Sequence, residues 1–178
     1  MPPERSAAGR GISLWLVPED AVRESLALLI GELAFRLGTQ GFAPHVTLLA
    51  GLRHAEDEAL GCAGSLAASL ETLFLPLGAP AGRKEHFRCL YLPVPETLKL
   101  LTARAQASLL FGVRDERSYE PHLSLVYGTL RDQEKQLLAS ELPPRLPPRA
   151  RFTHLEVVRT QGPCEGWRPL RSFALQGT

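Results

Sequence analysis

Cysteine is scarce in this sequence. Three cysteines, Cys62, Cys89 and Cys164, occur among 178 residues, and none belongs to a CxxC pair. No histidine stands at the usual metal-ligand spacing from another histidine or from a cysteine. These absences argue against a bound metal and, because the number is odd, against a secreted disulfide framework. We expect reduced thiols and a cytoplasmic location, while a single bridge between Cys62 and Cys164 stays open.

Long apolar runs and an excess of charge are also missing. No stretch is long and apolar enough to cross a bilayer, and residues 1–10 lack the apolar core of a secretory signal. We interpret residues 1–10 as a flexible tail. The net charge is only +1, which argues against a broad contact with duplex nucleic acid, although a small anionic ligand needs only a few local cations. We expect a monomeric protein with no membrane partner.

The chain contains one short pattern twice. The copies are Phe42–Gly51 and Tyr119–Gly128, and each has an aromatic residue, a Pro-His pair, a hydroxyl residue, an apolar run and a glycine. His122 follows His45 by 77 residues, and the same offset aligns residues 17–19 with residues 94–96, both Val-Pro-Glu. A duplicated unit explains two matches at one offset better than coincidence.

The repeat places chemistry on one face of a strand. Side chains alternate between the faces of a strand, so His45 and Thr47 point one way and Val46 points the other. His122 and Ser124 follow the same rule. If the two copies pack about an approximate two-fold axis, two imidazoles and two hydroxyls face each other across a cleft. One imidazole can then accept a proton while the other donates one.

Hydrophobic periodicity and Gly/Pro punctuation predict a mixed α+β fold. The composition, with 44% hydrophobic and 22% charged residues, suits a single domain built from two lobes over residues 1–178. A strand–helix–strand unit recurs, and residues 143–148 form a proline-rich connector. Helices are expected at about 18–38, 56–73, 95–112 and 132–140, and strands at about 12–17, 43–50, 74–77, 85–92, 151–159 and 167–175, with one more strand around His122.

The two motifs resemble the signatures of the 2H phosphoesterase superfamily, most closely those of plant and yeast cyclic phosphodiesterases. The resemblance is carried by Phe42-Ala43-Pro44-His45-Val46-Thr47 and by Pro121-His122-Leu123-Ser124-Leu125-Val126-Tyr127. Trp15, in the first expected strand, and Phe87-Arg88-Cys89, between the motifs, extend it. The similarity covers roughly residues 12–175. Two motifs in matched contexts make a far more specific signal than one.

The resemblance implies a bilobal fold, with two pseudo-two-fold-related lobes of mostly antiparallel sheet and outer helices enclosing a central cleft. It also implies an enzyme that hydrolyses cyclic phosphates without a cofactor or metal. The implied substrates are small nucleotides: ADP-ribose 1″,2″-cyclic phosphate, a by-product of tRNA splicing, and nucleoside 2′,3′-cyclic phosphates, which open to 2′-phosphates. Carried over residue by residue, the catalytic set is His45, Thr47, His122 and Ser124, and the substrate-binding set is Tyr127, Trp15 and Phe87.

The chemistry requires one neutral and one protonated imidazole, and both states are accessible near the reference pKa of about 6.5. We take His122 as the base and His45 as the acid, although the sequence does not fix this direction. The chain departs from the family at Glu120, where a neutral residue is expected. A disulfide known in plant relatives is not carried over, because no cysteine lies in the last strand to partner Cys62.

Other functions remain open at this stage. RNA-end 2′,3′-cyclic phosphodiesterases and other RNA-processing 2H enzymes share both motifs. A non-catalytic nucleotide-binding module is a further alternative, opposed by the presence of both histidines and both hydroxyls. A metal-dependent hydrolase ranks last. His54, His86 and His154 lack a matching context and are interpreted as structural or solvated, with His86 near enough to Phe87 to approach the cleft.

Overall fold

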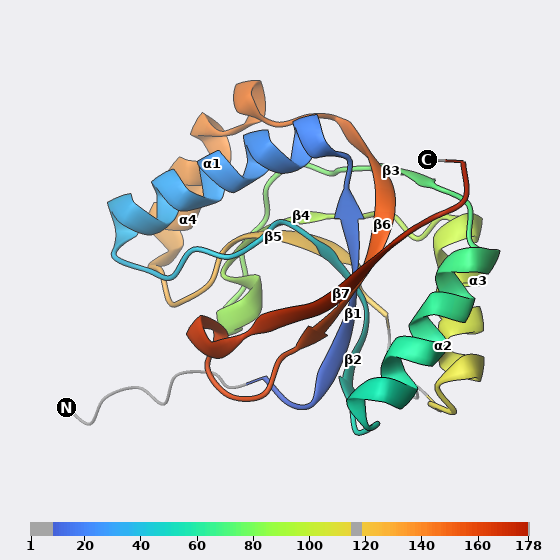
Figure 1. Cartoon of the computed structure of the whole chain (residues 1–178). Coiled ribbons are helices and arrows are strands. Elements are labelled where there is room, and N and C mark those ends of the chain that lie inside the picture. The colour runs from blue at the N-terminus through green and yellow to red at the C-terminus, as the bar shows by residue number, and fades with distance from the viewer. Residues whose placement is uncertain (1–8, 115–118, 178) are drawn as a thin grey trace.

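The computed structural model describes residues 9–114 and 119–177, and Figure 1 shows how its elements are arranged. The strands pair in one curled, antiparallel sheet in the order β3-β6-β1-β2-β5-β4, with β7 beside β6. The elements are β1 (Ile12–Pro18), α1 (Asp20–Leu37), β2 (Val46–Leu52), α2 (Glu56–Ser69), β3 (Leu73–Pro76), η1 (His86–Arg88), β4 (Leu90–Pro93), α3 (Leu98–Leu110), β5 (His122–Val126), α4 (Asp132–Glu141), η2 (Pro143–Arg145), β6 (Arg149–Arg159), η3 (Cys164–Gly166) and β7 (Arg168–Ala174).

The predicted duplication is visible in the sheet. The first copy is β1-α1-β2 and the second is β4-α3-β5, and the two meet where Val46 of β2 pairs with Leu123 of β5. Leu123 follows Val46 by the repeat offset of 77 residues, so the pseudo-two-fold axis passes through this pair. The helices are exchanged between the copies, because α1 packs against β5 and α3 packs against β2. The α+β, two-lobed architecture expected from the sequence is confirmed.

The helices lie in two pairs on the outside of the sheet. Figure 1 shows α1 with α4 on one side and α2 with α3 on the other. An ion pair joins α1 to α4, between Arg36 and Glu141, and a second joins α1 to the adjacent η2, between Glu32 and Arg145. None of the described helices has the length and apolar character needed to span a membrane.

The local sequence explains where the longest helix stops. Gly38, just past α1, has φ of 64°, a left-handed conformation in which glycine avoids the Cβ strain of other residues. The backbone N–H groups of Gly38 and Thr39 then satisfy the carbonyls of Phe35 and Ala34. The chain turns here toward the first histidine strand, so this cap helps to fix where His45 enters the sheet.

Both faces of β1 are buried, and the two faces have different partners. Leu14 and Leu16 belong to the main core between the sheet and the helices. Trp15 and Val17 point to the other face, where they pack with Val158 in a separate cluster. The alternation predicted for this strand is therefore confirmed, and it directs Trp15 away from the core toward the concave side of the sheet.

The predicted strand at 85–92 is wrong over its first half. Residues 86–88 form the 3-10 helix η1, and extended structure begins only at Leu90. The backbone is bent here because Gly128, just past β5, donates its N–H to the carbonyl of His86. The bend turns Phe87 and Arg88 toward the concave side of the sheet, which a regular strand would not do for two adjacent residues.

The neighbouring strands predicted at 74–77 and 85–92 do not pair with each other: β3 pairs with β6, and β4 pairs with β5. The segment that follows β3 contacts β4 through an isolated bridge between Ala81 and Tyr91 and through a hydrogen bond from the Gly78 N–H to the Pro93 carbonyl. Residues 1–8 of the predicted tail lie outside the described residues. Gly9 already pairs with Gly162, so the last part of that segment belongs to the fold.

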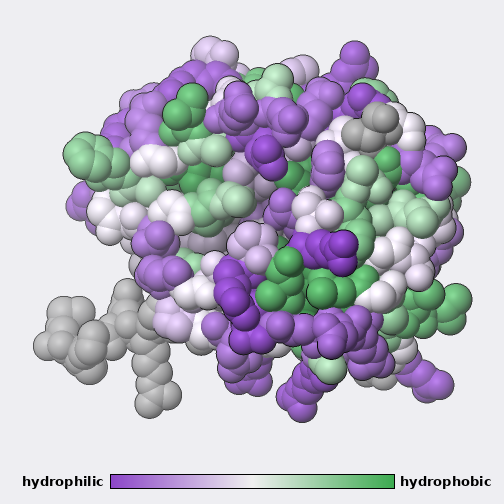
Figure 2. Space-filling view, viewed as in Figure 1, coloured by the Kyte–Doolittle hydropathy of each residue, from purple (hydrophilic) through white to green (hydrophobic). Residues whose placement is uncertain are grey.

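Large exposed apolar side chains are scattered over several elements, and Figure 2 shows green residues in separate areas among hydrophilic ones. Isolated exposed apolar residues are normal in soluble proteins. The monomeric state expected from the sequence stays a prediction.

Candidate active site

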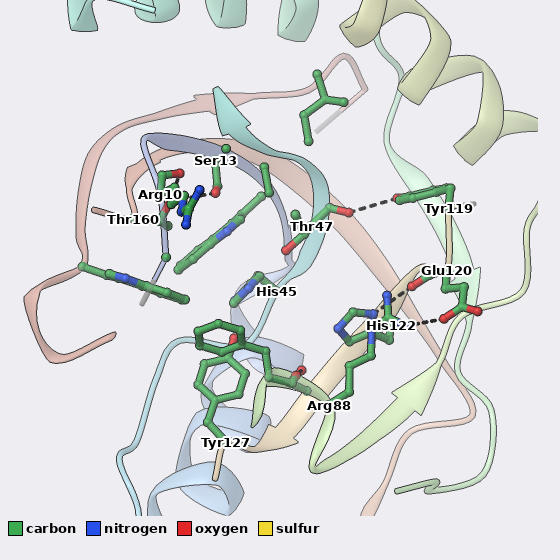
Figure 3. Close-up of a pocket in the computed structure, with 18 of the residues that line it drawn as sticks. Arg10, Ser13, His45, Thr47, Arg88, Tyr119, Glu120, His122, Tyr127 and Thr160 are labelled. Atoms are coloured by element: carbon green, nitrogen blue, oxygen red, sulfur yellow. Dashed lines mark hydrogen bonds and ion pairs between the residues drawn. The ribbon is translucent and has the colours of Figure 1, made fainter. Parts of the chain in front are cut away.

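All seven residues selected from the sequence line one cavity of about 690 Å³. The cavity lies on the concave side of the sheet, and Figure 3 shows His45 and His122 on facing sides of it. Its volume falls within the usual range for sites that bind small molecules. The residues brought together are His45, Thr47, His122, Ser124, Tyr127, Trp15 and Phe87.

Strand alternation delivers the four central side chains. His45 immediately precedes β2 and Thr47 lies within it, while His122 begins β5 and Ser124 follows two residues later. The intervening Val46 and Leu123 are fully buried in the core on the opposite face. Burial of the apolar face therefore fixes which way the histidines and hydroxyls point.

The two histidines have the same tautomer for the same reason. His45 Nδ1 lies 2.7 Å from the carbonyl oxygen of Ala43, and His122 Nδ1 lies 2.8 Å from that of Glu120. A carbonyl oxygen only accepts, so each Nδ1 must carry the proton. Glu120 follows Ala43 by 77 residues, so this contact is part of the repeat. In the neutral ring, the lone pair is then on Nε2, which is the arrangement a general base needs.

Burial lowers the pKa of both rings and so favours their neutral forms. It lowers the pKa of His45 to about 4, against a smaller rise from the Ala43 carbonyl and a further lowering from His122. Burial also lowers the pKa of His122, which is only half-buried. At neutral pH, an imidazole that acts as an acid must therefore take up its proton when the anionic substrate arrives.

The two rings have different neighbours despite the repeat. His45 stacks on Trp15 with ring centroids 3.6 Å apart and planes within 7°, whereas His122 meets the edge of Tyr91 at 5.5 Å. Trp15 is 6% exposed, and His45 covers one of its faces. The contact observed for Trp15 is the stack with His45. A ligand could therefore stack only on the part of the Trp15 ring that His45 leaves uncovered.

An aromatic wall continues from Trp15 around the cavity. Tyr127 stacks on Phe42 at 3.6 Å and meets Phe87 edge-on at 5.1 Å. Trp167, from the segment before β7, lies 5.4 Å from Phe87 and 6.0 Å from Trp15. The sequence interpretation missed Trp167, because nothing in its local sequence shows that the C-terminal segment returns to the repeat.

The hydroxyls differ in their partners. Ser124 Oγ donates to the carbonyl oxygen of Phe87 at 2.7 Å, while Thr47 lines the cavity and its backbone carbonyl accepts from the Tyr119 hydroxyl at 3.0 Å. A hydroxyl has one proton, so Ser124 must rotate away from Phe87 before it can donate to a ligand. Thr47 has no such competing side-chain bond among residues 9–114 and 119–177.

Arginines in the cavity wall were not selected from the sequence. Arg88 lies beside His122 and pairs with the carboxylate of Glu120, which also binds Arg83 at 2.7 Å. Arg104, from α3, stacks over Tyr119 at 3.9 Å and donates to the carbonyl of Leu48. The two arginine partners hold the pKa of Glu120 below its usual range. The unexpected carboxylate at position 120 is thus an ion-pair partner for Arg88.

The remaining polar candidates lie elsewhere. His86 packs on Phe87 and does not line the cavity, and His154 contacts Thr153. The described thiols of Cys62, Cys89 and Cys164 are free, so the bridge left open between Cys62 and Cys164 is absent. Within the part of the chain that the structure describes, no three His, Cys, Asp or Glu side chains gather as a metal site.

Comparison with known proteins gives a consistent match. A family model described as cyclic phosphodiesterase-like protein matches residues 10–175, a range that contains every cavity residue named above. A cyclic phosphodiesterase from Arabidopsis thaliana is 25% identical over 124 residues, which cover 70% of this chain and 68% of that protein.

Solved structures share the fold at low identity. LigT of E. coli, in its apo form, aligns with 95% of this chain and 99% of its own, with 14% identity and a TM-score of 0.59. TT0787 of Thermus thermophilus aligns with 94% of this chain and 98% of its own, with 17% identity and a TM-score of 0.57. LigT has also been crystallised with 3′-AMP, in a structure that covers 94% of this chain and 99% of its own, with 12% identity and a TM-score of 0.57.

Proposed function

Because the chain belongs to the cyclic phosphodiesterase-like family of 2H phosphoesterases, we propose that it hydrolyses cyclic phosphates on small nucleotides without a metal. The resemblance drawn from its two motifs is confirmed at the level of the family. The proposed reactions open ADP-ribose 1″,2″-cyclic phosphate to ADP-ribose 1″-phosphate and nucleoside 2′,3′-cyclic phosphates to 2′-phosphates. The complex of LigT with 3′-AMP supports a nucleotide ligand for this fold.

One observation carries the proposal. Two histidines from symmetry-related strands face one cavity, and each is locked through Nδ1 onto the carbonyl two residues before it. Both Nε2 atoms are then available for proton transfer at a shared substrate. The matched pair of backbone contacts goes beyond what two unrelated structural histidines would require.

In the proposed reaction, the base removes a proton from water as the water oxygen attacks phosphorus. One ring P–O bond breaks, and the acid delivers its proton to the leaving oxygen. The net change is the addition of one water molecule. Thr47 donates to a non-bridging oxygen, and Ser124 does so after releasing the Phe87 carbonyl. Arg88 adds positive charge beside the developing negative charge.

We keep His122 as the base and His45 as the acid. His122 is half-buried and His45 is buried, so water reaches His122 more easily. A base that activates water must be accessible to it. His45 lies against the face of Trp15, and an aromatic face stabilises a cation. The Ala43 carbonyl also favours the protonated ring, and both effects oppose the burial that lowers the pKa of His45.

Ligand binding is therefore expected to be coupled to proton uptake. Burial lowers the pKa of His45 to about 4 in the free protein, and a bound phosphate anion is expected to raise it. At a pH between the His45 pKa of the free protein and that of the complex, binding takes up close to one proton and therefore weakens as pH increases. Calorimetry with a nucleoside 2′,3′-cyclic phosphorothioate, in buffers of different ionisation enthalpy, measures this number.

Matched variants make the measurement specific. Uptake that disappears in His45→Gln and persists in His122→Gln supports His45 as the acid. The reverse pattern assigns the acid to His122. If the wild-type protein binds this ligand without proton uptake, neither ring gains a proton on binding, and the proposed acid–base pair is contradicted.

Product analysis tests the reaction itself. The protein is incubated in EDTA with ADP-ribose 1″,2″-cyclic phosphate, with a nucleoside 2′,3′-cyclic phosphate and with an oligonucleotide that ends in a cyclic phosphate. We expect turnover of the two small substrates at a rate unchanged by the chelator. Turnover of the oligonucleotide alone moves the assignment to RNA-end processing. Nucleotide binding with no turnover supports a binding module, and loss of activity on chelation contradicts the proposed mechanism.

A further inference from the structure

A second cavity, of about 560 Å³, adjoins the first. The two share Arg10 and Arg53, which line both. Neither arginine was selected from the sequence, and neither belongs to the acid–base machinery. The second cavity is otherwise lined by Gly11, Ile12, Leu52, His54, Glu56, Arg159 and Gln161.

Strand pairing brings the two arginines together. Arg10 lies just before β1 and Arg53 just after β2, and Ile12 pairs with Leu52 where these strand ends meet. The backbones approach so closely that a Cβ on Gly11 would lie 2.1 Å from the carbonyl oxygen of Leu52. Gly11 also has φ of 64°, so glycine is doubly required at this junction.

The junction carries uncompensated positive charge. Glu56 is the only carboxylate among the described residues that line the second cavity, and it is held by Arg159 and, at 3.8 Å, by Arg168. No carboxylate or other side-chain partner binds the guanidinium of Arg10 or Arg53 among residues 9–114 and 119–177. Two exposed cations thus remain between the catalytic cavity and its neighbour.

We propose that Arg10 and Arg53 form a second phosphate-binding subsite, which selects substrates that carry an additional phosphate beyond the cyclic one. Guanidinium groups bind phosphate oxygens through two parallel hydrogen bonds, and a pair of them suits a second anionic group. This inference rests on the proposed function, because the first phosphate must be held at the histidines. The additional phosphate has two possible sources, a diphosphate such as that of ADP-ribose or the next phosphodiester of an RNA end.

The test compares substrates that differ by one group. Adenosine 2′,3′-cyclic phosphate and its 5′-phosphorylated form are assayed with wild-type protein and with Arg10→Gln, Arg53→Gln and the double variant. We expect the wild-type protein to prefer the 5′-phosphorylated form by about tenfold in kcat/KM, as charge-assisted hydrogen bonds allow. The double variant loses this preference. Because the arginines are exposed, the preference also declines as salt is increased.

A charge-matched control is available on the same sheet. Arg149 is exposed, begins β6 at the end far from Arg159, and lines neither cavity. Arg149→Gln removes one positive charge, as Arg10→Gln or Arg53→Gln does, and is expected to keep the full preference. The proposal is overturned if the preference survives in the double variant. It is also overturned if Arg149→Gln reduces the preference as much as Arg10→Gln or Arg53→Gln does.

Further arms identify the source and separate two kinds of failure. ADP-ribose 1″,2″-cyclic phosphate and a dinucleotide ending in a cyclic phosphate report which anionic group depends on the arginines. Turnover of adenosine 2′,3′-cyclic phosphate without any 5′-phosphate preference overturns the subsite and leaves the proposed function standing.

If no substrate is turned over, calorimetry with adenosine 2′,5′-bisphosphate and adenosine 2′-phosphate tests the subsite separately. Equal affinity for the two ligands in the wild-type protein then overturns the subsite, and tighter bisphosphate binding that the double variant loses supports it.

Discussion

Replacing either His45 or His122 by alanine is expected to lower kcat/KM for a nucleoside 2′,3′-cyclic phosphate by about 10²–10⁴-fold. This is the usual contribution of one positioned general acid or base. The losses arise because each ring occupies one side of the same cavity with its Nε2 unblocked. The double variant is expected to lose little more than either single one, because the two proton transfers serve a single reaction.

The controls separate chemistry from folding. His154→Ala removes a half-buried histidine of β6 that contacts Thr153 and lies outside the cavity, so it is expected to retain activity. Imidazole added to His122→Ala, the more open of the two sites, is expected to restore part of the rate. Folded His45→Ala and His122→Ala proteins with near wild-type kcat/KM would show that the rings are structural.

Removing the hydroxyl of Thr47 is expected to have the next largest effect. Thr47→Val keeps the shape and the β-branched character suited to β2 and deletes one donor from the cavity. A donor aimed at developing negative charge is worth about 3–4 kcal/mol, which corresponds to a loss of about 10²–10³-fold in kcat. Steady-state kinetics show whether the loss falls on kcat.

Ser124→Ala is the matched comparison. The Ser124 hydroxyl already donates to the Phe87 carbonyl, so its removal also leaves that oxygen without its partner. We expect Ser124→Ala to lower both kcat and stability, and Thr47→Val to lower kcat with little loss of stability. Thr129→Val changes an exposed threonine outside the cavity and is expected to change neither. A higher KM with unchanged kcat in Thr47→Val would show that the hydroxyl binds substrate and transition state equally.

The secondary structure was predictable where local signals agree with the final packing. The helix before Gly38 and the strand around Trp15 follow directly from their periodicity and punctuation. The predicted strand at 85–92 failed because Gly128, some 40 residues away, donates to His86 and bends the chain into η1. The pairing of β3 with β6 depends on contacts at still greater separation, which local propensity does not contain.

The sequence by itself determined the duplicated motif and, through strand alternation, the common face of His45, Thr47, His122 and Ser124. Burial of Val46 and Leu123 on the opposite face then leaves those side chains no other direction. Only the tertiary structure decided that His45 lies against Trp15 and that arginines from separate elements converge on the cavity. The physical reason is that strand alternation acts between adjacent residues, whereas convergence depends on how distant strand ends and helices pack.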